Sequence, residues 1–203
     1  MSLFEDIVFP WINDLSLGPR FAPIRARVAG AAEGRVLEIG SGTGLNFEHY
    51  APTVKVTAVE PAPGMRRFAA RRGRVTESVT LIEGKARELP FDAGSFDTVV
   101  ITFTLCSIRE AGVGAALAEV KRVLRAGGVV RLAEHVRDPD PSRARTQRSV
   151  DPAWGVVFGG CSLLRDPREE LERAGFDVSA IEDVALPLPW VVRAGQVGVA
   201  RRA

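Results

Sequence analysis

The chain has 203 residues, the size of one ordinary domain, and 27 basic against 25 acidic residues leave a formal net charge of +2. The basic residues are spread along the chain, so the composition gives no case for nucleic-acid binding. No apolar run approaches the ~20 residues of a membrane span, and the first residues do not resemble a signal peptide. We therefore expect a single soluble, cytoplasmic domain over residues 1–203.

The N-terminal segment is predicted to form a helical cap over residues 1–32. Apolar residues recur at helical spacing from Leu3 to Leu15, and Pro10 should kink or end the first turns. A second helix is expected from Pro23 to Ala32. The cap can pack on the core or cover a pocket. Contact with a membrane is the alternative, but the acidic polar side of the first helix argues against it, because interfacial helices are usually rich in Lys and Arg.

Alternating strand and helix patterns follow the cap and predict an open α/β sheet with helices on both faces. Five strands are expected, at residues 35–39, 54–59, 79–82, 96–102 and 129–136. The helices expected among them cover residues 45–50, 63–72 and 113–124, and a later helix covers residues 166–174. Two final strands, Phe176 to Val184 and Gly195 to Arg201, have no room for a full helix between them. They can pair as an antiparallel hairpin at the sheet edge.

A glycine-rich turn follows the first strand and is the strongest candidate for a ligand site. Gly40, Gly42 and Gly44 can adopt backbone angles closed to other residues and let a cofactor approach the main chain, although a sharp connection without a ligand gives the same pattern. Glu60 ends the second strand about 20 residues on, where an acid can bond both hydroxyls of a ribose. Loops at the carboxyl ends of parallel strands bind ligands in this architecture, which adds residues 60–65, 84–87 and 102–106 as candidates.

Charge and spacing favour S-adenosylmethionine over a nicotinamide dinucleotide. The dinucleotide fingerprint is Gly-x-Gly-x-x-Gly, and here the third glycine comes one residue early. Glu38 beside the turn would repel a pyrophosphate, but it can help to hold the ammonium of a methionine moiety, directly or through water.

These motifs together resemble those of the class I S-adenosylmethionine-dependent methyltransferases. Glu38-x-Gly40-x-Gly42-x-Gly44 matches the first motif, Glu60 the ribose acid, Leu89-Pro90-Phe91 with Phe96-Asp97 the central segment, and residues 123–128 the turn before the fifth strand. The resemblance implies a Rossmann-like, mostly parallel sheet of strand order 3-2-1-4-5-7-6, with S-adenosyl-L-homocysteine as the product. It implies these cofactor-binding residues: Glu38, Gly40, Ser41, Gly42, Gly44, Asn46, Glu60, Pro61, Met65, Lys85, Ala86, Arg87, Thr102, Phe103 and Cys106. Lys85 stands where many relatives carry an acid near the adenine amine, so adenine recognition is expected from the Ala86 backbone and from apolar contacts of Met65 or Phe103.

A closer resemblance is to the thiol methyltransferases of the methyltransferase-like seven group. It is carried by Asn46-Phe47 after the glycine turn, residues 104–107, residues 133–136, Asp151-Pro152-Ala153-Trp154 and Gly160-Cys161. That group associates with membranes through an N-terminal hydrophobic segment and is similar to phospholipid and ubiquinone-type methyltransferases. No such segment is recognisable here, so we expect no membrane contact.

The acceptor side of the site is expected in residues 137–165, the segment after the fifth strand. Methyl transfer needs alignment and exclusion of water but no enzyme nucleophile, and a thiol acceptor must react as its thiolate. His135 is the leading base candidate, against a histidine that only packs; His49 is taken as structural. Asp151 would orient the acceptor or act as base, with Trp154 and Phe158 as pocket walls. The alternative is that Asp151 caps a helix and is followed by Pro152, and that the two aromatic side chains simply pack in the core.

The two cysteines, Cys106 and Cys161, lie far apart and form no Cys-x-x-Cys pair. This spacing predicts neither a disulfide framework nor a zinc site, so we expect small buried side chains and no metal.

The sequence therefore predicts a methyltransferase acting on a small-molecule acceptor, with a thiol as first choice. An amine or hydroxyl acceptor, including a quinone or lipid head group, is the alternative among methyltransferases. A cofactor-binding module without catalysis and a Rossmann dehydrogenase are the other possibilities.

Overall fold

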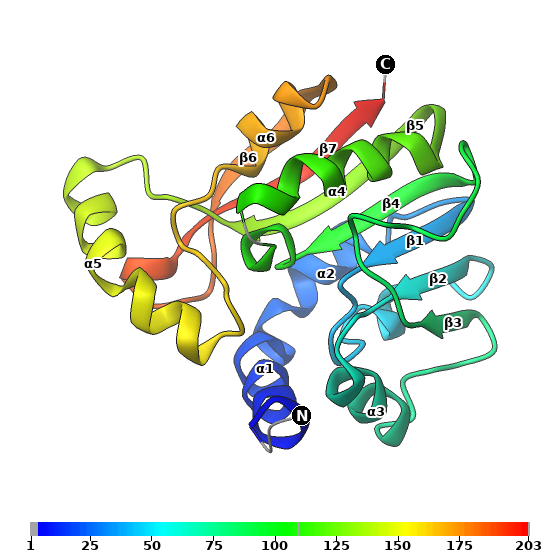
Figure 1. The fold of residues 1–203 in the computed structure, drawn as a ribbon, viewed down its shortest axis with the longest axis horizontal. Coiled ribbons are helices and arrows are strands. Elements are labelled where there is room, and N and C mark those ends of the chain that lie inside the picture. The colour runs from blue at the N-terminus through cyan, green and yellow to red at the C-terminus, as the bar shows by residue number, and fades with distance from the viewer. Residues whose placement is uncertain (1–3, 109, 203) are drawn as a thin grey trace.

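Seven strands form one sheet at the centre of the computed structural model, which describes residues 4–108 and 110–202 (Figure 1). The strands are β1 (Arg35–Ile39), β2 (Lys55–Val59), β3 (Val79–Ile82), β4 (Phe96–Thr102), β5 (Leu124–His135), β6 (Phe176–Ala185) and β7 (Ala194–Arg202). Their order is β3-β2-β1-β4-β5-β7-β6, and β7 runs antiparallel to both of its neighbours. The predicted order and the terminal hairpin are confirmed.

Alternating side chains of the central strands pack into two apolar layers, one on each face of the sheet. Val36 of β1 and Val100 of β4 belong to one layer, whereas the adjacent Leu37 and Val99 belong to the other. Successive residues of a strand point to opposite faces, so a strand buried on both sides must be apolar throughout. In Figure 1, α2 (Ala22–Val28) lies behind the sheet and α4 (Glu110–Val123) in front of it; both contact β5.

The N-terminal residues form the expected helical cap, in shorter pieces. The cap consists of a π-helical turn η1 (Phe4–Val8), α1 (Phe9–Leu17), a 3₁₀ turn η2 (Pro19–Phe21) and α2. Pro10 does not end the helix; it sits at the start of α1, where its missing N–H costs no hydrogen bond. The remaining helical elements are η3 (Phe47–His49), α3 (Pro63–Arg71), η4 (Leu105–Ser107), α5 (Pro141–Val157), α6 (Pro167–Arg173) and η5 (Trp190–Val192).

Helix α5 is an element that the sequence pattern did not predict. Asp140 caps its N-terminus by accepting the backbone N–H groups of Ser142 and Arg143. Its 17 residues carry many polar side chains, so the sequence shows no apolar stripe there. Pro152 also interrupts the run of helix-forming residues. The alternative interpretation of Asp151-Pro152 as a helix cap is wrong, because both residues lie inside the helix.

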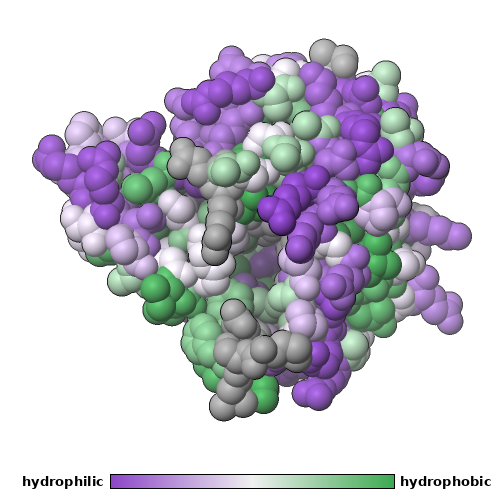
Figure 2. Space-filling model, viewed as in Figure 1, coloured by the Kyte–Doolittle hydropathy of each residue, from purple (hydrophilic) through white to green (hydrophobic). Residues whose placement is uncertain are grey.

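The helical cap is tied to the glycine turn. Asp14 of α1 accepts a hydrogen bond from the Thr43 hydroxyl at 3.1 Å and forms an ion pair with Arg74. Trp11 packs edge to face on Phe68 of α3, with ring centroids 5.3 Å apart. Hydrophobic side chains of η1 and α1 also remain on the surface, at the bottom of Figure 2. Among the described helices, none combines the length and the apolar character needed to cross a bilayer.

Candidate active site

The candidate site lies where β1 and β4 end, and the face shown in Figure 2 is hollowed there. Gly40, Gly42 and Gly44 have φ angles of 67°, 56° and 77°, in the region that side chains disfavour. A Cβ at Gly40 would lie 2.3 Å from Thr104 Cγ2, and one at Gly44 would lie 2.8 Å from the Phe47 ring. All three positions therefore favour glycine for their conformation, and Gly40 and Gly44 also for space, whereas a Cβ at Gly42 would meet only Asn13 Oδ1 at 3.8 Å.

Glu38 lies beneath the turn and is 1% exposed. Its carboxylate accepts hydrogen bonds from Asn46 Nδ2 at 2.9 Å and from the Tyr50 hydroxyl at 2.7 Å. Burial raises the pKa of Glu38 to about 7, although both hydrogen bonds and the Arg25 charge oppose this rise. Arg25 is itself buried and donates to Asn46 Oδ1 at 2.7 Å. The Glu38 carboxylate therefore holds Asn46 and Tyr50, which follow the glycine turn, in place.

Glu60 follows β2 and faces the same turn. Its two carboxylate oxygens accept the backbone N–H groups of Gly42 at 2.9 Å and Ala62 at 2.8 Å. Burial raises the pKa of Glu60 from its usual value, and these two hydrogen bonds partly offset the rise. The structure thus brings the two sequence-predicted acids, Glu38 and Glu60, near one turn, with Glu60 bound directly to the Gly42 backbone.

The predicted adenine-side residues divide into buried and exposed groups. Met65 of α3 is buried, and Ala86 packs against the apolar core near the end of β3. Pro61, Lys85 and Arg87 are exposed. The apolar pair can form the walls of a base-binding site, whereas the exposed side chains offer no enclosed surface.

Phe103 is the one non-glycine residue with a positive φ, 52°, among the described residues. Its ring stacks on His135 at 6.4 Å between centroids and meets Phe21 edge to face at 5.0 Å. The preceding residue, Thr102, is buried and accepts a hydrogen bond from Asn46 at 2.9 Å. Unfavourable backbone angles persist where surrounding contacts hold them and occur preferentially at functional sites.

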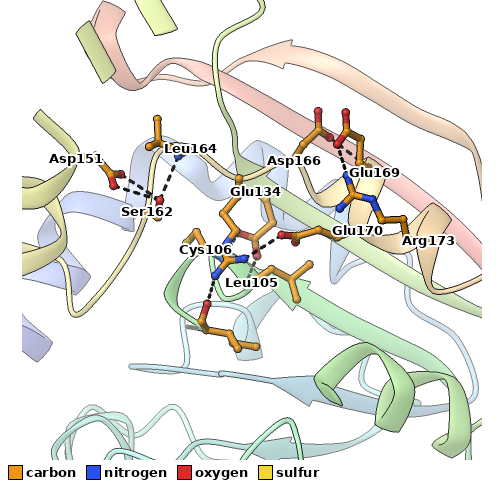
Figure 3. A network of polar contacts seen from close by, with 12 residues as sticks. Leu105, Cys106, Glu134, Asp151, Ser162, Leu164, Asp166, Glu169, Glu170 and Arg173 are labelled. Atoms are coloured by element: carbon orange, nitrogen blue, oxygen red, sulfur yellow. Dashed lines mark hydrogen bonds and ion pairs between the residues drawn. The ribbon is translucent and has the colours of Figure 1, made fainter. Parts of the chain in front are cut away.

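Glu134 of β5 holds the loop that follows β4. This fully buried carboxylate accepts the backbone N–H groups of Thr104 at 2.6 Å and Leu105 at 3.0 Å, and contacts that of Cys106 at 3.5 Å (Figure 3). Burial raises its pKa, and the backbone donors partly offset the rise. Glu134 therefore determines where η4 presents Cys106.

Cys106, His135 and Cys161 form a buried cluster, which we call the sulfur–imidazole cluster. Cys161 Sγ lies 3.3 Å from Cys106 Sγ and 3.0 Å from His135 Nε2. Burial raises the pKa of the Cys106 thiol well above its usual value, so the free thiol is neutral. The pKa of His135 is raised despite its burial, mainly through Cys106 and then Glu134. Because the two cysteines lie far apart in the sequence, their spacing did not predict this contact.

Asp151 and Trp154 lie on α5 beside this cluster. The Asp151 carboxylate accepts the Leu163 N–H at 2.6 Å and the Ser162 hydroxyl at 3.1 Å, which anchors the loop carrying Cys161 (Figure 3). Trp154 stacks on Phe158 at 4.0 Å between centroids. Cys106, Asp151 and Ser162 line a cavity of about 520 Å³.

The residues around the glycine turn fit S-adenosylmethionine. Ser41 Oγ is buried within the turn and has no hydrogen-bond partner among the described residues, which leaves a polar atom for a ligand. The positive-φ glycines keep side chains away from the main chain, and Glu60 places a carboxylate beside it. A larger cavity of about 630 Å³ lies between α4 and α6, away from these residues, so size alone does not mark the site.

Three contributors to the site were not assigned by sequence reasoning. Tyr50 and Arg25 complete the buried network of Glu38, and Glu134 positions η4. A polar residue at the end of an apolar strand was a signal for Glu134. For Arg25 nothing in the local pattern distinguishes a buried arginine from an exposed one.

Comparisons with known proteins identify similar chains. A family model described as a methyltransferase domain matches residues 37–132. Human thiol S-methyltransferases TMT1A and TMT1B are 37% and 35% identical to this chain over 76% and 84% of its length, and the chain spans 65% and 71% of theirs. Phosphatidylethanolamine N-methyltransferase of Cereibacter sphaeroides is 37% identical over 79% of this chain and 83% of that protein. The crystal structure of an S-adenosylmethionine-dependent methyltransferase from Thermotoga maritima shares the fold, with a TM-score of 0.70, 22% identity and 98% coverage of both chains.

We expect Gly40→Ala to weaken S-adenosylhomocysteine binding at least about tenfold, because the added Cβ collides with Thr104 and distorts the turn. Gly73→Ala is the matched control: Gly73 has a similar φ of 65°, but a Cβ there meets nothing within 4 Å. Both variants incur the left-handed backbone cost of about 1–2 kcal/mol. Calorimetric titration measures the difference, and equal affinity of the two variants would contradict the steric explanation.

The raised pKa of Glu38 should make stability depend on pH. A carboxyl group whose pKa rises on folding stabilises the fold below its unfolded value of 4.5 and loses that contribution as the pH rises through about 7. We expect this group to lower the free energy of unfolding by up to about 3 kcal/mol between about pH 5 and pH 8. Glu38→Gln should lack that part of the slope, as measured by urea denaturation.

Glu119→Gln is the control for this experiment, since hydrogen bonds from Arg122 lower the pKa of Glu119 to about 2 and it does not titrate in that range. Identical pH slopes for the wild type and Glu38→Gln would refute the assignment.

Proposed function

This chain belongs to the S-adenosylmethionine-dependent methyltransferases, and we propose that it transfers the methyl group to the sulfur of a small thiol. The observation that carries the proposal is the similarity to TMT1B, which extends over 84% of this chain and therefore beyond the cofactor-binding half.

On the cofactor side, S-adenosylmethionine when bound supplies an electrophilic methyl group on a sulfonium. The glycine turn would hold its methionine and ribose parts, with Glu60 as the acceptor for ribose hydroxyls. Met65 and Ala86 would form the apolar walls at the adenine. Glu38 is 1% exposed beneath the turn and accepts hydrogen bonds from Asn46 and Tyr50, so it would act on the cofactor by positioning Asn46.

On the acceptor side, the thiol must lose its proton before its sulfur forms the new bond to the methyl carbon. The electron pair of the broken carbon–sulfur bond remains with S-adenosylhomocysteine, and the product is a neutral thioether. A cavity of about 520 Å³ next to Cys106 is within the size range of small-molecule sites. Asp151 would define this cavity by anchoring Ser162 and Leu163, whereas Trp154, predicted as an aromatic wall, is not among its lining residues.

His135 serves the reaction through the cysteines. Its ring is 5% exposed, and Nε2 faces Cys161 Sγ at 3.0 Å, so proton exchange directly with an acceptor would have to pass this sulfur. We therefore assign His135 as a positioning residue that holds Cys161, and through it Cys106, beside the acceptor cavity.

An amine acceptor is the second candidate function. The bacterial phosphatidylethanolamine N-methyltransferase is covered over 83% of its length, more than either human thiol S-methyltransferase. An amine needs only a group that accepts its proton, and Asp151 lines the same cavity.

An acceptor panel tests the choice. The full chain is incubated with radiolabelled S-adenosylmethionine and, separately, a small aliphatic thiol, a primary amine, a phenol and vesicles containing phosphatidylethanolamine. We expect the thiol to be labelled at least about tenfold faster than any other acceptor, because the thiolate is the strongest nucleophile of the set near neutral pH. Transfer to the amine or the vesicles alone would overturn S-methylation and favour the second candidate.

We expect His135→Ala to lower kcat with the thiol by at least about tenfold and to change S-adenosylhomocysteine affinity less than about twofold. The other histidine, His49→Ala, is the control and should change neither quantity, since it lies on η3 outside the sulfur–imidazole cluster. Parallel loss of turnover and cofactor affinity in His135→Ala would indicate a purely structural role.

A further inference from the structure

The sulfur–imidazole cluster has the composition of a metal site. Two cysteines and one histidine place their donor atoms within 4.8 Å of one another, and all three residues are buried. Thiolate and imidazole donors select zinc among the common divalent ions, whereas the oxygen ligands that magnesium and calcium prefer do not belong to the cluster. We propose that Cys106, His135 and Cys161 bind one Zn²⁺ ion and leave its fourth coordination position open.

The distances in the cluster are compatible with an ion after a small expansion. In a tetrahedral zinc site, bonds of ~2.3 Å to sulfur and ~2.0 Å to nitrogen separate two sulfurs by about 3.8 Å and a sulfur from a nitrogen by about 3.5 Å. The corresponding distances here are 3.3 Å and 3.0 Å. These two pairs of donor atoms need to move apart by about half an ångström, and the third pair also lies within 4.8 Å.

Contacts behind the donor atoms hold the three ligand-bearing segments together. Glu134 anchors the backbone of η4 on the Cys106 side, and the Ser162 N–H donates to the Cys106 carbonyl at 2.9 Å. Asp151 fixes the loop that carries Cys161 through Ser162 and Leu163. In metal sites, contacts of this kind orient the side chains that coordinate the ion.

Charge balance also favours a divalent ion at this buried position. Two thiolates and a neutral imidazole carry a charge of −2, which a divalent cation cancels, so the filled site is neutral and its burial carries little electrostatic cost. Metal binding would release the thiol protons to solvent. Affinity should therefore rise with pH.

The open position gives the ion a chemical role. Three protein ligands with one free position are typical of catalytic zinc, and Cys106 borders the cavity lined by Asp151 and Ser162. A thiol that coordinates zinc is deprotonated. This step rests on the proposed function: the acceptor thiol would coordinate the ion, lose its proton to solvent and present its thiolate sulfur to the methyl group. Metal binding itself does not depend on that function.

Cobalt titration tests the metal site without any acceptor. The full chain is reduced, stripped with a chelator and titrated anaerobically with Co²⁺. We expect one equivalent to bind, with a thiolate-to-cobalt charge-transfer band that Zn²⁺ abolishes. Cys106→Ser and Cys161→Ser should weaken binding at least about tenfold. His135→Cys, which keeps a ligand, should retain the band, whereas His135→Ala should lose affinity.

His49→Gln is the control variant and should bind Co²⁺ like the wild type. Circular dichroism checks that each variant is folded. Absence of the band in the folded wild-type chain, or an undiminished band in both serine variants, would overturn the metal site.

A second measurement tests coordination of the acceptor. Addition of a small aliphatic thiol with S-adenosylhomocysteine should strengthen the charge-transfer band, and chelator-stripped protein should methylate the thiol at least about tenfold more slowly until Zn²⁺ is restored. A bound ion with an unchanged spectrum and unchanged turnover would overturn coordination of the acceptor. If the ion binds but no thiol is methylated in the acceptor panel, the proposed function fails and the metal site stands.

Discussion

The buried carboxylate of Glu38 is the constraint on which the cofactor side of this protein depends. A carboxylate in an apolar interior is costly unless hydrogen bonds compensate it, and here Asn46, Tyr50 and the charge of Arg25 do so. These partners come from two segments: Asn46 and Tyr50 flank η3, and Arg25 lies on α2. The contacts that compensate the buried Glu38 carboxylate therefore connect the helical cap and the chain after the glycine turn to the end of β1.

Glu134, two strands away in the sheet, is likewise a buried carboxylate that accepts several hydrogen bonds. It ends β5 as Glu38 ends β1, and the strand between them, β4, carries the loop that both sides of the site share. Its carboxylate gathers the backbone of η4 beneath Phe103, the residue with the unfavourable φ. The strain at Phe103 is held by the stacking of its ring on His135, the residue next to Glu134. Glu134 thus fixes the loop after β4, and the Thr104 hydroxyl connects this loop to the carbonyl groups of Ile39 and Gly40 at the end of β1.

The acceptor side is built from segments with little regular pattern of their own. Helix α5 brings Asp151 to the loop after it, and that loop returns Cys161 to η4 and β5. Small changes in α5 would therefore move the cavity without disturbing the glycine turn, since the two sets of contacts share only the loop after β4. A thiol S-methyltransferase and a phosphatidylethanolamine N-methyltransferase are both among the proteins that this chain resembles.

Local sequence determined most of the sheet and the location of the glycine turn that we propose as the cofactor site. Strands β1, β3 and β4 begin and end where the apolar runs do, because buried parallel strands must be apolar. The regular spacing of the three glycines marked the turn after β1. Residue pattern also identified Glu38 and Glu60 as the acids flanking that turn. Only the tertiary structure decided how Glu38 is neutralised and that α5 is a helix through Pro152. It also decided that His135 contacts Cys161, 26 residues away, and that Cys161 contacts Cys106, 55 residues away. The physical reason is that strand and turn signals act over a few residues, whereas these contacts arise where parallel strand ends and a returning loop converge in space.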